Sequence, residues 1–196
     1  MNHMTCLRRQ RCRGITLVET AVSVLIVSML VLASMQSLTS SFKSSQFSQN
    51  RSKGMFLAEQ LLVELSLLPW RDPQNPATAD TVGRDTGDPS NVTRRDQLDD
   101  VDDFDNWLES PVATRAGTSL SGVPAAWRRS VLVDNVSPTN PSSTVADNAG
   151  QGVRRLTVVV DDGLTELARL SVLVSSADAA LRSASDQQRS LPNVSQ

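Results

Sequence analysis

The pattern of apolar and polar residues predicts a long helix at the start of the chain. Apolar residues dominate from Ile15 to Met35, and no proline occurs between Ile15 and Leu68. Farther along, five apolar residues recur at the three- and four-residue spacing of an amphipathic helix: Ala58, Leu61, Leu62, Leu65 and Leu68. Pro69 ends the pattern, so we expect one helix over residues 15–68 with one buried face in its second half. Gly54 interrupts this helix and is interpreted as a tolerated glycine, with a weak point as the alternative.

Strand-like runs occupy the C-terminal part of the chain. Apolar residues alternate in Trp127–Val136, Val153–Asp161 and Leu164–Ser175, which is typical of strands with one buried face. Asp162-Gly163 predicts a two-residue hairpin turn between the last two runs. The prolines at positions 138 and 141 predict a loose loop between the first two. A long helix followed by an antiparallel meander gives an α+β fold class, with the helix packed on a small sheet.

These patterns divide the chain into six segments. We expect a basic leader over residues 1–14, a transmembrane half of the helix over 15–36 and an extracytoplasmic half over 37–68. An irregular region rich in proline and aspartate follows over 69–126, then the meander over 127–176 and a polar tail over 177–196.

Charge and length indicate how the chain meets a membrane. The apolar run is long enough to span a bilayer, which requires about 20 residues. Four arginines crowd the first fourteen residues, which carry no acid, and the positive-inside rule keeps such a segment in the cytoplasm. The sequence therefore predicts a single span in a bacterial inner membrane, with the C-terminal part outside the cytoplasm. Without those arginines, 15 basic residues face 21 acidic ones, and so we expect no nucleic-acid partner.

A short motif stands before the apolar run. Arg13-Gly14-Ile15-Thr16-Leu17-Val18-Glu19 joins a glycine, an apolar residue and a glutamate at fixed spacing. A carboxylate at membrane depth costs a few kcal/mol, so Glu19 is out of place in a plain anchor. The motif resembles the cleavage and methylation site of type IV prepilins, although Ile15 stands where Phe or Met is usual.

The resemblance implies a processing reaction and an assembly. It implies that a prepilin peptidase cuts between Gly14 and Ile15 and methylates the new amino group of Ile15. It further implies that Glu19 pairs with the N-terminal amine of a neighbouring subunit. The fold implied is that of a pilin, and the function implied is that of a minor pilin or minor pseudopilin of a type IV pilus or type II secretion filament. Other pilins or pseudopilins and an inner-membrane assembly platform would be its partners. The alternative is a single-span extracytoplasmic binding module that does not polymerise.

The residue inventory leaves little catalytic chemistry. Both cysteines and the only histidine lie in the leader, at positions 6, 12 and 3, so a processed chain has no thiol or imidazole. The only lysines, Lys43 and Lys53, fall on the long helix, away from the strands that would form a pocket. We therefore expect a structural protein rather than an enzyme, and no cofactor other than a metal ion.

One acidic segment remains open to interpretation. Aspartates crowd residues 96–105, and Leu98, Val101, Phe104 and Trp107 are interleaved with them at three-residue steps. A solvated acidic surface is one reading and glycosidase-type acid–base chemistry is another. The third is a calcium site, because hard cations take several carboxylate and carbonyl oxygens. Its candidate ligands are Asp100, Asp102, Asp103 and Asp105.

Overall fold

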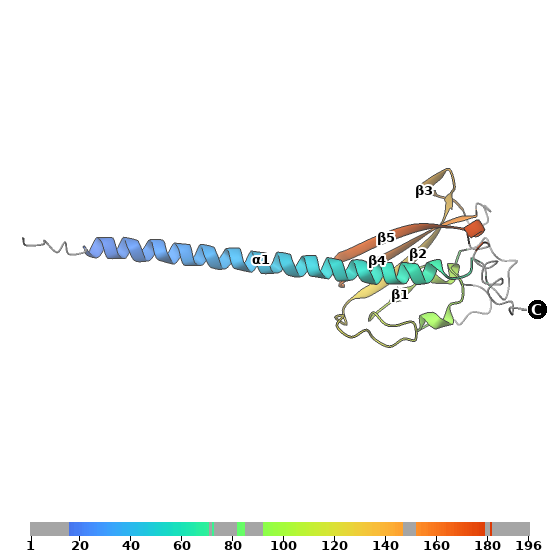
Figure 1. Cartoon of the computed structure of the whole chain (residues 1–196), viewed down its shortest axis with the longest axis horizontal. Coiled ribbons are helices and arrows are strands. Elements are labelled where there is room, and N and C mark those ends of the chain that lie inside the picture. The colour runs from blue at the N-terminus through green and yellow to red at the C-terminus, as the bar shows by residue number, and fades with distance from the viewer. Residues whose placement is uncertain are drawn as a thin grey trace, which may run out of the picture. The chain divides into compact units, whose positions relative to one another are not determined.

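The computed structural model describes residues 16–70, 72, 82–84, 92–146, 152–178 and 181. The chain divides into two compact units, Met1–Ser48 and Gln49–Gln196, which are described separately. A single α-helix, α1 (Leu17–Ser66), begins in the first unit and ends in the second, as the sequence predicted (Figure 1).

In the first unit, α1 is exposed along its whole length. Its most apolar window has a mean hydropathy of 2.2 and is entirely exposed, so α1 is long and apolar enough to cross a membrane. The hydroxyls of Ser23, Ser28 and Ser34 donate to the carbonyl four residues earlier, at 2.7–2.8 Å. These polar groups are therefore satisfied within the helix, as a lipid environment requires.

In the second unit, the end of α1 packs on an antiparallel sheet. Leu61 and Leu65 are fully buried on one face of the helix, while Phe56 and Val63 remain exposed on the other. Gly54 is also buried, and its Cα faces Leu167 of the sheet. The predicted apolar face of the helix is therefore the face that forms the core.

The sheet has five strands, and its order is β1-β2-β4-β5 with β3 paired to β2. The strands are β1 (Leu108–Glu109), β2 (Arg128–Ser137), β3 (Asn140–Thr144), β4 (Val153–Asp161) and β5 (Glu166–Ser175). Leu156, Val158 and Val160 of β4 point to the helix and are fully buried. The α+β class and the three predicted strands are confirmed, and the strands lie roughly lengthwise along α1 (Figure 1).

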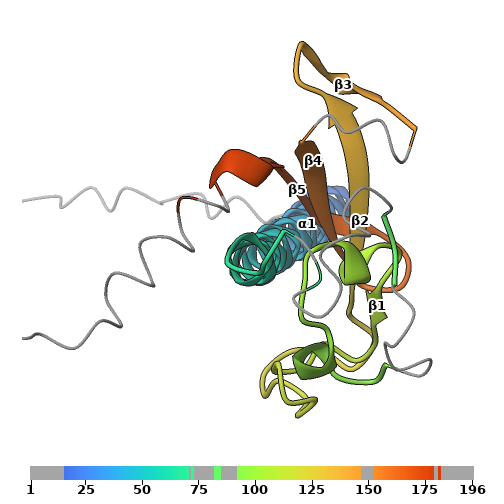
Figure 2. The ribbon, with the colours of Figure 1, turned by 90° about the vertical axis from the view of Figure 1, so that its right-hand side faces the viewer.

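The segment before β2 carries more structure than expected. It contains two 3-10 helices, η2 (Arg95–Gln97) and η3 (Asp102–Phe104), and the short strand β1. The four interleaved apolar residues, Leu98, Val101, Phe104 and Trp107, are all buried. Viewed along the helix, α1 lies beside β5, and this segment lies toward β1 and β2 (Figure 2).

Two local predictions were wrong. Residues 140–144 form β3 rather than a loose loop, and Pro141 fits because β3 pairs with β2 at only two positions, Val136↔Thr144 and Ser137↔Asn140. The link between β4 and β5 has four residues instead of two. The Asp162 carboxylate accepts the amides of Leu164 and Thr165, and this side-chain bonding favours the wider turn.

Candidate functional site: the helix start and two buried charge clusters

The predicted assembly residue lies in the first turn of α1. Glu19 is exposed, and its backbone N–H donates to Oγ1 of Thr16 at 3.3 Å. Thr16 precedes the helix, so Thr16 and Glu19 have the spacing and half of the bonding of a capping box. A negative side chain here also interacts favourably with the helix dipole. Gly14 and Ile15, the predicted processing residues, lie outside the described residues.

The acidic segment is not a solvated surface, as one reading of the sequence had it. Asp100, just before η3, and Asp102 and Asp103 within it are only 2–3% exposed. The Asp100 carboxylate accepts the backbone N–H of Asp103 at 3.1 Å. The Asp105 carboxylate instead accepts the N–H of Val133 on β2, at 3.1 Å.

Asp102 belongs to a buried cluster around Arg154 of β4. Nη1 of Arg154 lies 2.9 Å from Oδ1 of Asp102 and donates to the carbonyl of Trp70 at 2.8 Å. The guanidinium also stacks on the indole of Trp70, at 4.4 Å from the ring centroid. One cation thus holds the residues after α1, the η3 turn and β4 together.

Two carboxylates share this one cation. Burial, and next the charge of Asp102, raise the pKa of Asp100 from 3.8 to about 7. Burial also raises the pKa of Asp102, although Arg154 opposes this shift. Below this pKa the Asp100 carboxyl is protonated and can donate a hydrogen bond to Asp102. With Asp100 protonated and Asp102 ionised, the pair would place one negative charge opposite one guanidinium.

Calcium binding stays a prediction. The described residues contain no group of three or more His, Cys, Asp or Glu side chains placed to hold a metal ion. Asp102 is engaged by Arg154, Asp100 by the Asp103 amide and Asp105 by the Val133 amide. The fourth predicted ligand, Asp103, accepts the Asp99 amide at 3.3 Å, so each of the four carboxylates already has a partner within the protein.

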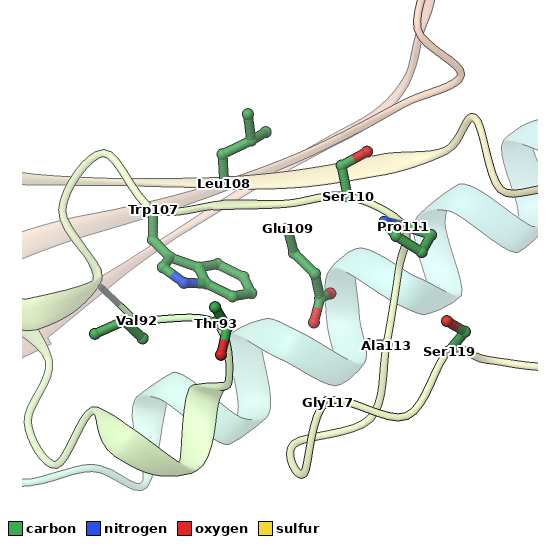
Figure 3. Close-up of a pocket in the computed structure, with 10 residues that line it drawn as sticks. All are labelled: Val92, Thr93, Trp107, Leu108, Glu109, Ser110, Pro111, Ala113, Gly117 and Ser119. Atoms are coloured by element: carbon green, nitrogen blue, oxygen red, sulfur yellow. The ribbon is translucent and has the colours of Figure 1, made fainter. Parts of the chain in front are cut away.

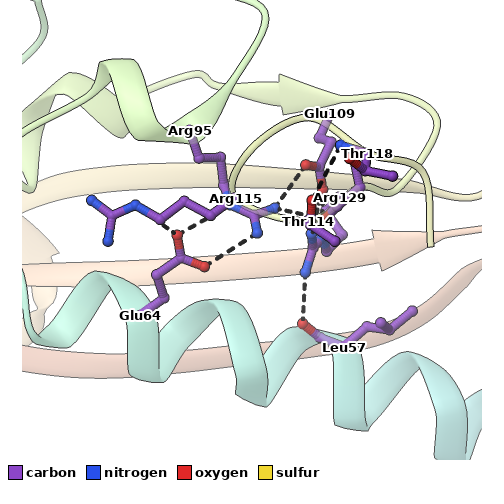
Figure 4. Close-up of polar contacts among 9 residues, drawn as sticks. Leu57, Glu64, Arg95, Glu109, Thr114, Arg115, Thr118 and Arg129 are labelled. Carbon is purple, nitrogen blue, oxygen red and sulfur yellow. Dashed lines mark hydrogen bonds and ion pairs between the residues drawn. The ribbon is translucent and has the colours of Figure 1, made fainter.

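A second buried cluster was missed by the sequence analysis (Figure 4). Glu109 of β1 receives Nη1 of Arg95 and Nε of Arg129, each at 2.7 Å. Both guanidiniums also donate to the carbonyl of Ala113, at 3.1 and 2.7 Å. Arg95 reaches Glu64 on α1 at 3.2 Å. The cluster therefore joins η2, β1, β2 and the helix.

A pattern in the sequence could have located both clusters. Among the residues that the structure describes, three Arg-Arg pairs occur, and in each pair one arginine is buried and its neighbour is more exposed. The buried members are Arg95, Arg129 and Arg154. On a strand, consecutive side chains point to opposite faces, so an Arg-Arg pair inside a half-buried strand places one guanidinium in the core. The outward members of the strand pairs, Arg128 and Arg155, bind Asp161 and Asp134.

A pocket of about 300 Å³ borders the second cluster (Figure 3). The indole of Trp107, the carboxylate of Glu109 and the hydroxyls of Thr93, Ser110 and Ser119 line it. Both oxygens of Glu109 already accept hydrogen bonds from arginines. The pocket therefore offers hydroxyls and an aromatic wall, and its carboxylate serves the structure.

Comparisons with protein families, with curated proteins and with solved structures found no match to the chain.

Proposed function

We propose that this chain is a minor pilin or minor pseudopilin that helps to start or cap a type IV pilus or a type II secretion filament. A prepilin peptidase would first cut it between Gly14 and Ile15. It would sit in the bacterial inner membrane as a single span with residues 37–196 outside the cytoplasm. The observation that carries the proposal is α1, whose apolar half is wholly exposed and whose other half forms a core with the sheet.

The exposed half of α1 needs an apolar environment. Leu25, Leu30 and Leu32 are each more than half exposed, and they would be covered by lipid or by the helices of other subunits. The rest of the helix is committed to the sheet, so this protein presents an apolar helix from a folded extracytoplasmic body. A filament built from such helices suits that arrangement.

Glu19 decides between an assembling subunit and a plain anchor. Glu19 stands at the third position of the helix, where a glutamate can act as a capping residue, but a glutamine would cap the helix equally well. A charge is needed only if a cationic group of another subunit lies close to it, because an ionised side chain in a membrane is costly. The N-terminal amine of a neighbouring subunit is that group in our proposal.

Substitution of Glu19 separates these two roles. In cells that carry the native assembly machinery, we expect Glu19→Gln and Glu19→Ala to insert normally. Crosslinking to other pilin-like subunits should fall in both variants, by about tenfold if about 1.4 kcal/mol of charge pairing is lost. Glu19→Asp, which keeps the charge, is the matched control and should retain part of the crosslinking.

A different outcome would contradict the proposal. If Glu19→Gln crosslinks like the wild type while Glu19→Ala does not, the side chain acts as a helix cap. If neither variant changes the crosslinking, the chain is better described as a membrane-anchored binding module that does not polymerise.

A further inference from the structure

The two edges of the sheet are built differently. Three hydrogen bonds close the side of β2 that faces away from β4. Val131 N–H donates to the Trp107 carbonyl at 2.9 Å, and Val133 N–H donates to the Asp105 carboxylate at 3.1 Å. The Asn135 carbonyl accepts the N–H of Val145 at 2.9 Å. The Asp105 carboxylate takes the place that a carbonyl of a neighbouring strand would occupy. No further strand can therefore pair with β2 in this stretch.

The edge at β5 is open. Within the residues that the structure describes, no strand pairs with the side of β5 that faces away from β4. The N–H of Ser176 donates to the carbonyl of Gly152 at 2.9 Å, and the register continues from this pair along both strands. Along an antiparallel strand, the N–H and C=O groups of successive residues point alternately to one side and to the other. The backbone groups of every second residue of β5 therefore point to β4. The outward groups are those of Arg169, Ser171, Leu173 and Ser175.

The β2 edge gives the same assignment independently. Val131 and Val133 direct their N–H groups away from β4, so Ser130 and Leu132 face β4. Their partners on β4 are Val159 and Thr157, which leaves the alternate β4 residues to face β5. The register pairs those residues with Leu170, Val172 and Val174, so the backbone groups of these three residues face β4 and those of Ser171 and Leu173 face outward.

The open edge lacks the usual protection against pairing. Natural edge strands carry charges, prolines or bulges that discourage another strand. Leu170–Ser175 contains no charged residue, no glycine and no proline. Glu166 and Arg169, just before it, bind each other at 2.6 Å. Leu170 and Val172 point toward the core but are only partly buried.

We propose that the open edge of β5 accepts an extended strand of another protein, which pairs antiparallel with Leu170–Ser175. The strand would be uncharged, because the edge offers it no charge to pair with. It would be apolar at alternate positions, because one of its faces completes the cover over Leu170 and Val172. Its main-chain groups would bind Ser171 and Leu173, in the mode of β-strand addition.

A second copy of β5 does not fit this place. An antiparallel pair of two β5 strands about a twofold axis would reverse the direction of the α1 segment that lies along the sheet. Copies anchored in one membrane by straight, parallel α1 helices would not take that arrangement. This exclusion rests on the anchoring in our proposed function, whereas the open edge itself does not.

The test uses the full chain in detergent and measures amide exchange residue by residue. The probe is a capped peptide of five alternating valine–threonine pairs, whose threonines would lie on the same face as Ser171 and donate to β5. At saturation we expect the exchange of the Ser171 and Leu173 amides to slow by about tenfold or more. The amide of Val172 already points to β4 and should not change.

Two controls make the result specific. A peptide with N-methylated threonines cannot donate and should have no effect. Leu173→Lys should abolish the protection, whereas Leu132→Lys, on a similarly exposed residue whose strand has a closed edge, should leave it intact. The proposal is overturned if neither amide responds, if the methylated peptide acts equally, or if protection appears on raising the concentration of the protein alone.

Discussion

At the scale of single residues, Gly54 shows why α1 can approach the sheet so closely. A Cβ at this position would lie 2.9 Å from the Cβ of Leu167 and 3.5 Å from that of Ala168. The nearer distance is too short for two carbon atoms, and a Cβ cannot swing aside as the end of a long side chain can. Packing therefore requires a glycine at this position, whereas the sequence suggested only that a glycine is tolerated there.

We expect Gly54→Ala to destabilise the protein. Alanine gains about 1 kcal/mol of helix propensity over glycine, and forced overlap in a packed core costs about 1–3 kcal/mol. The net loss should lower the melting temperature of the full chain in detergent by a few degrees, at about 2–4 °C per kcal/mol. Gln60→Ala, at an exposed position of the same helix, is the control. A melting temperature equal to or above that of the wild type would show that the sheet moves away at little cost.

At the scale of elements, the ion pair between Asp102 of η3 and Arg154 of β4 should respond to pH. The pKa of Asp100 is about 7 in the folded protein and 3.8 ordinarily, because burial and Asp102 disfavour its charge. A folded-state pKa above the unfolded one means that the folded protein holds a proton which the unfolded chain releases. The stability that this proton contributes is fully present below about pH 4 and is lost as pH rises through about 7.

Asp100→Asn should weaken this dependence. Asparagine is always neutral and can donate to Asp102 as the protonated acid does. We expect the melting temperature of the wild type to fall more between pH 5 and pH 8 than that of the variant. Asp96→Asn, which alters a partly exposed pair with Arg94, is the control and should fall as the wild type does. Parallel curves for the wild type and Asp100→Asn would contradict the shifted pKa.

The elements themselves were largely predictable, and their polar links were not. Helical spacing identified α1, and alternation identified β2, β4 and β5, because each pattern is local. Arg154 and Asp102 are 52 residues apart in the chain, and Arg129 and Glu109 are 20 apart. Which charges meet across such distances depends on the sheet register and on where η2 and η3 turn. No local pattern contains that information.

At the scale of the whole molecule, the proposal requires a particular mature N-terminus. Mass spectrometry of the membrane-extracted protein should find Ile15 as the first residue, with one added methyl group. Gly14→Leu should block the cut, because the peptidase acts on a backbone that has no side chain there, and Thr5→Ala in the leader is the control. An N-terminus beyond Met35 would indicate ordinary signal cleavage and would contradict both the membrane anchor and the filament.

The candidate site was predictable only where its residues are close together in the sequence. Glu19 stands in the predicted helix start, while its bond from the N–H to Thr16 emerged from the structure. The aspartates were seen as a group in the sequence, but their burial could not be inferred, since it depends on Arg154 arriving from β4. A composition count treats Asp100 and Asp105 alike, although the first is buried beside another acid and the second closes a sheet edge.

The lengthwise packing of α1 on the strands has a mechanical consequence (Figure 1). A pull on the helix along its axis, as in a filament under tension, would slide Leu57, Leu61 and Leu65 past the sheet together. The contacts from Gly54 to Leu65 would then share the load, and none could break alone. A pull perpendicular to the sheet would peel the same contacts away one turn at a time. The fold should therefore withstand axial force better than transverse force.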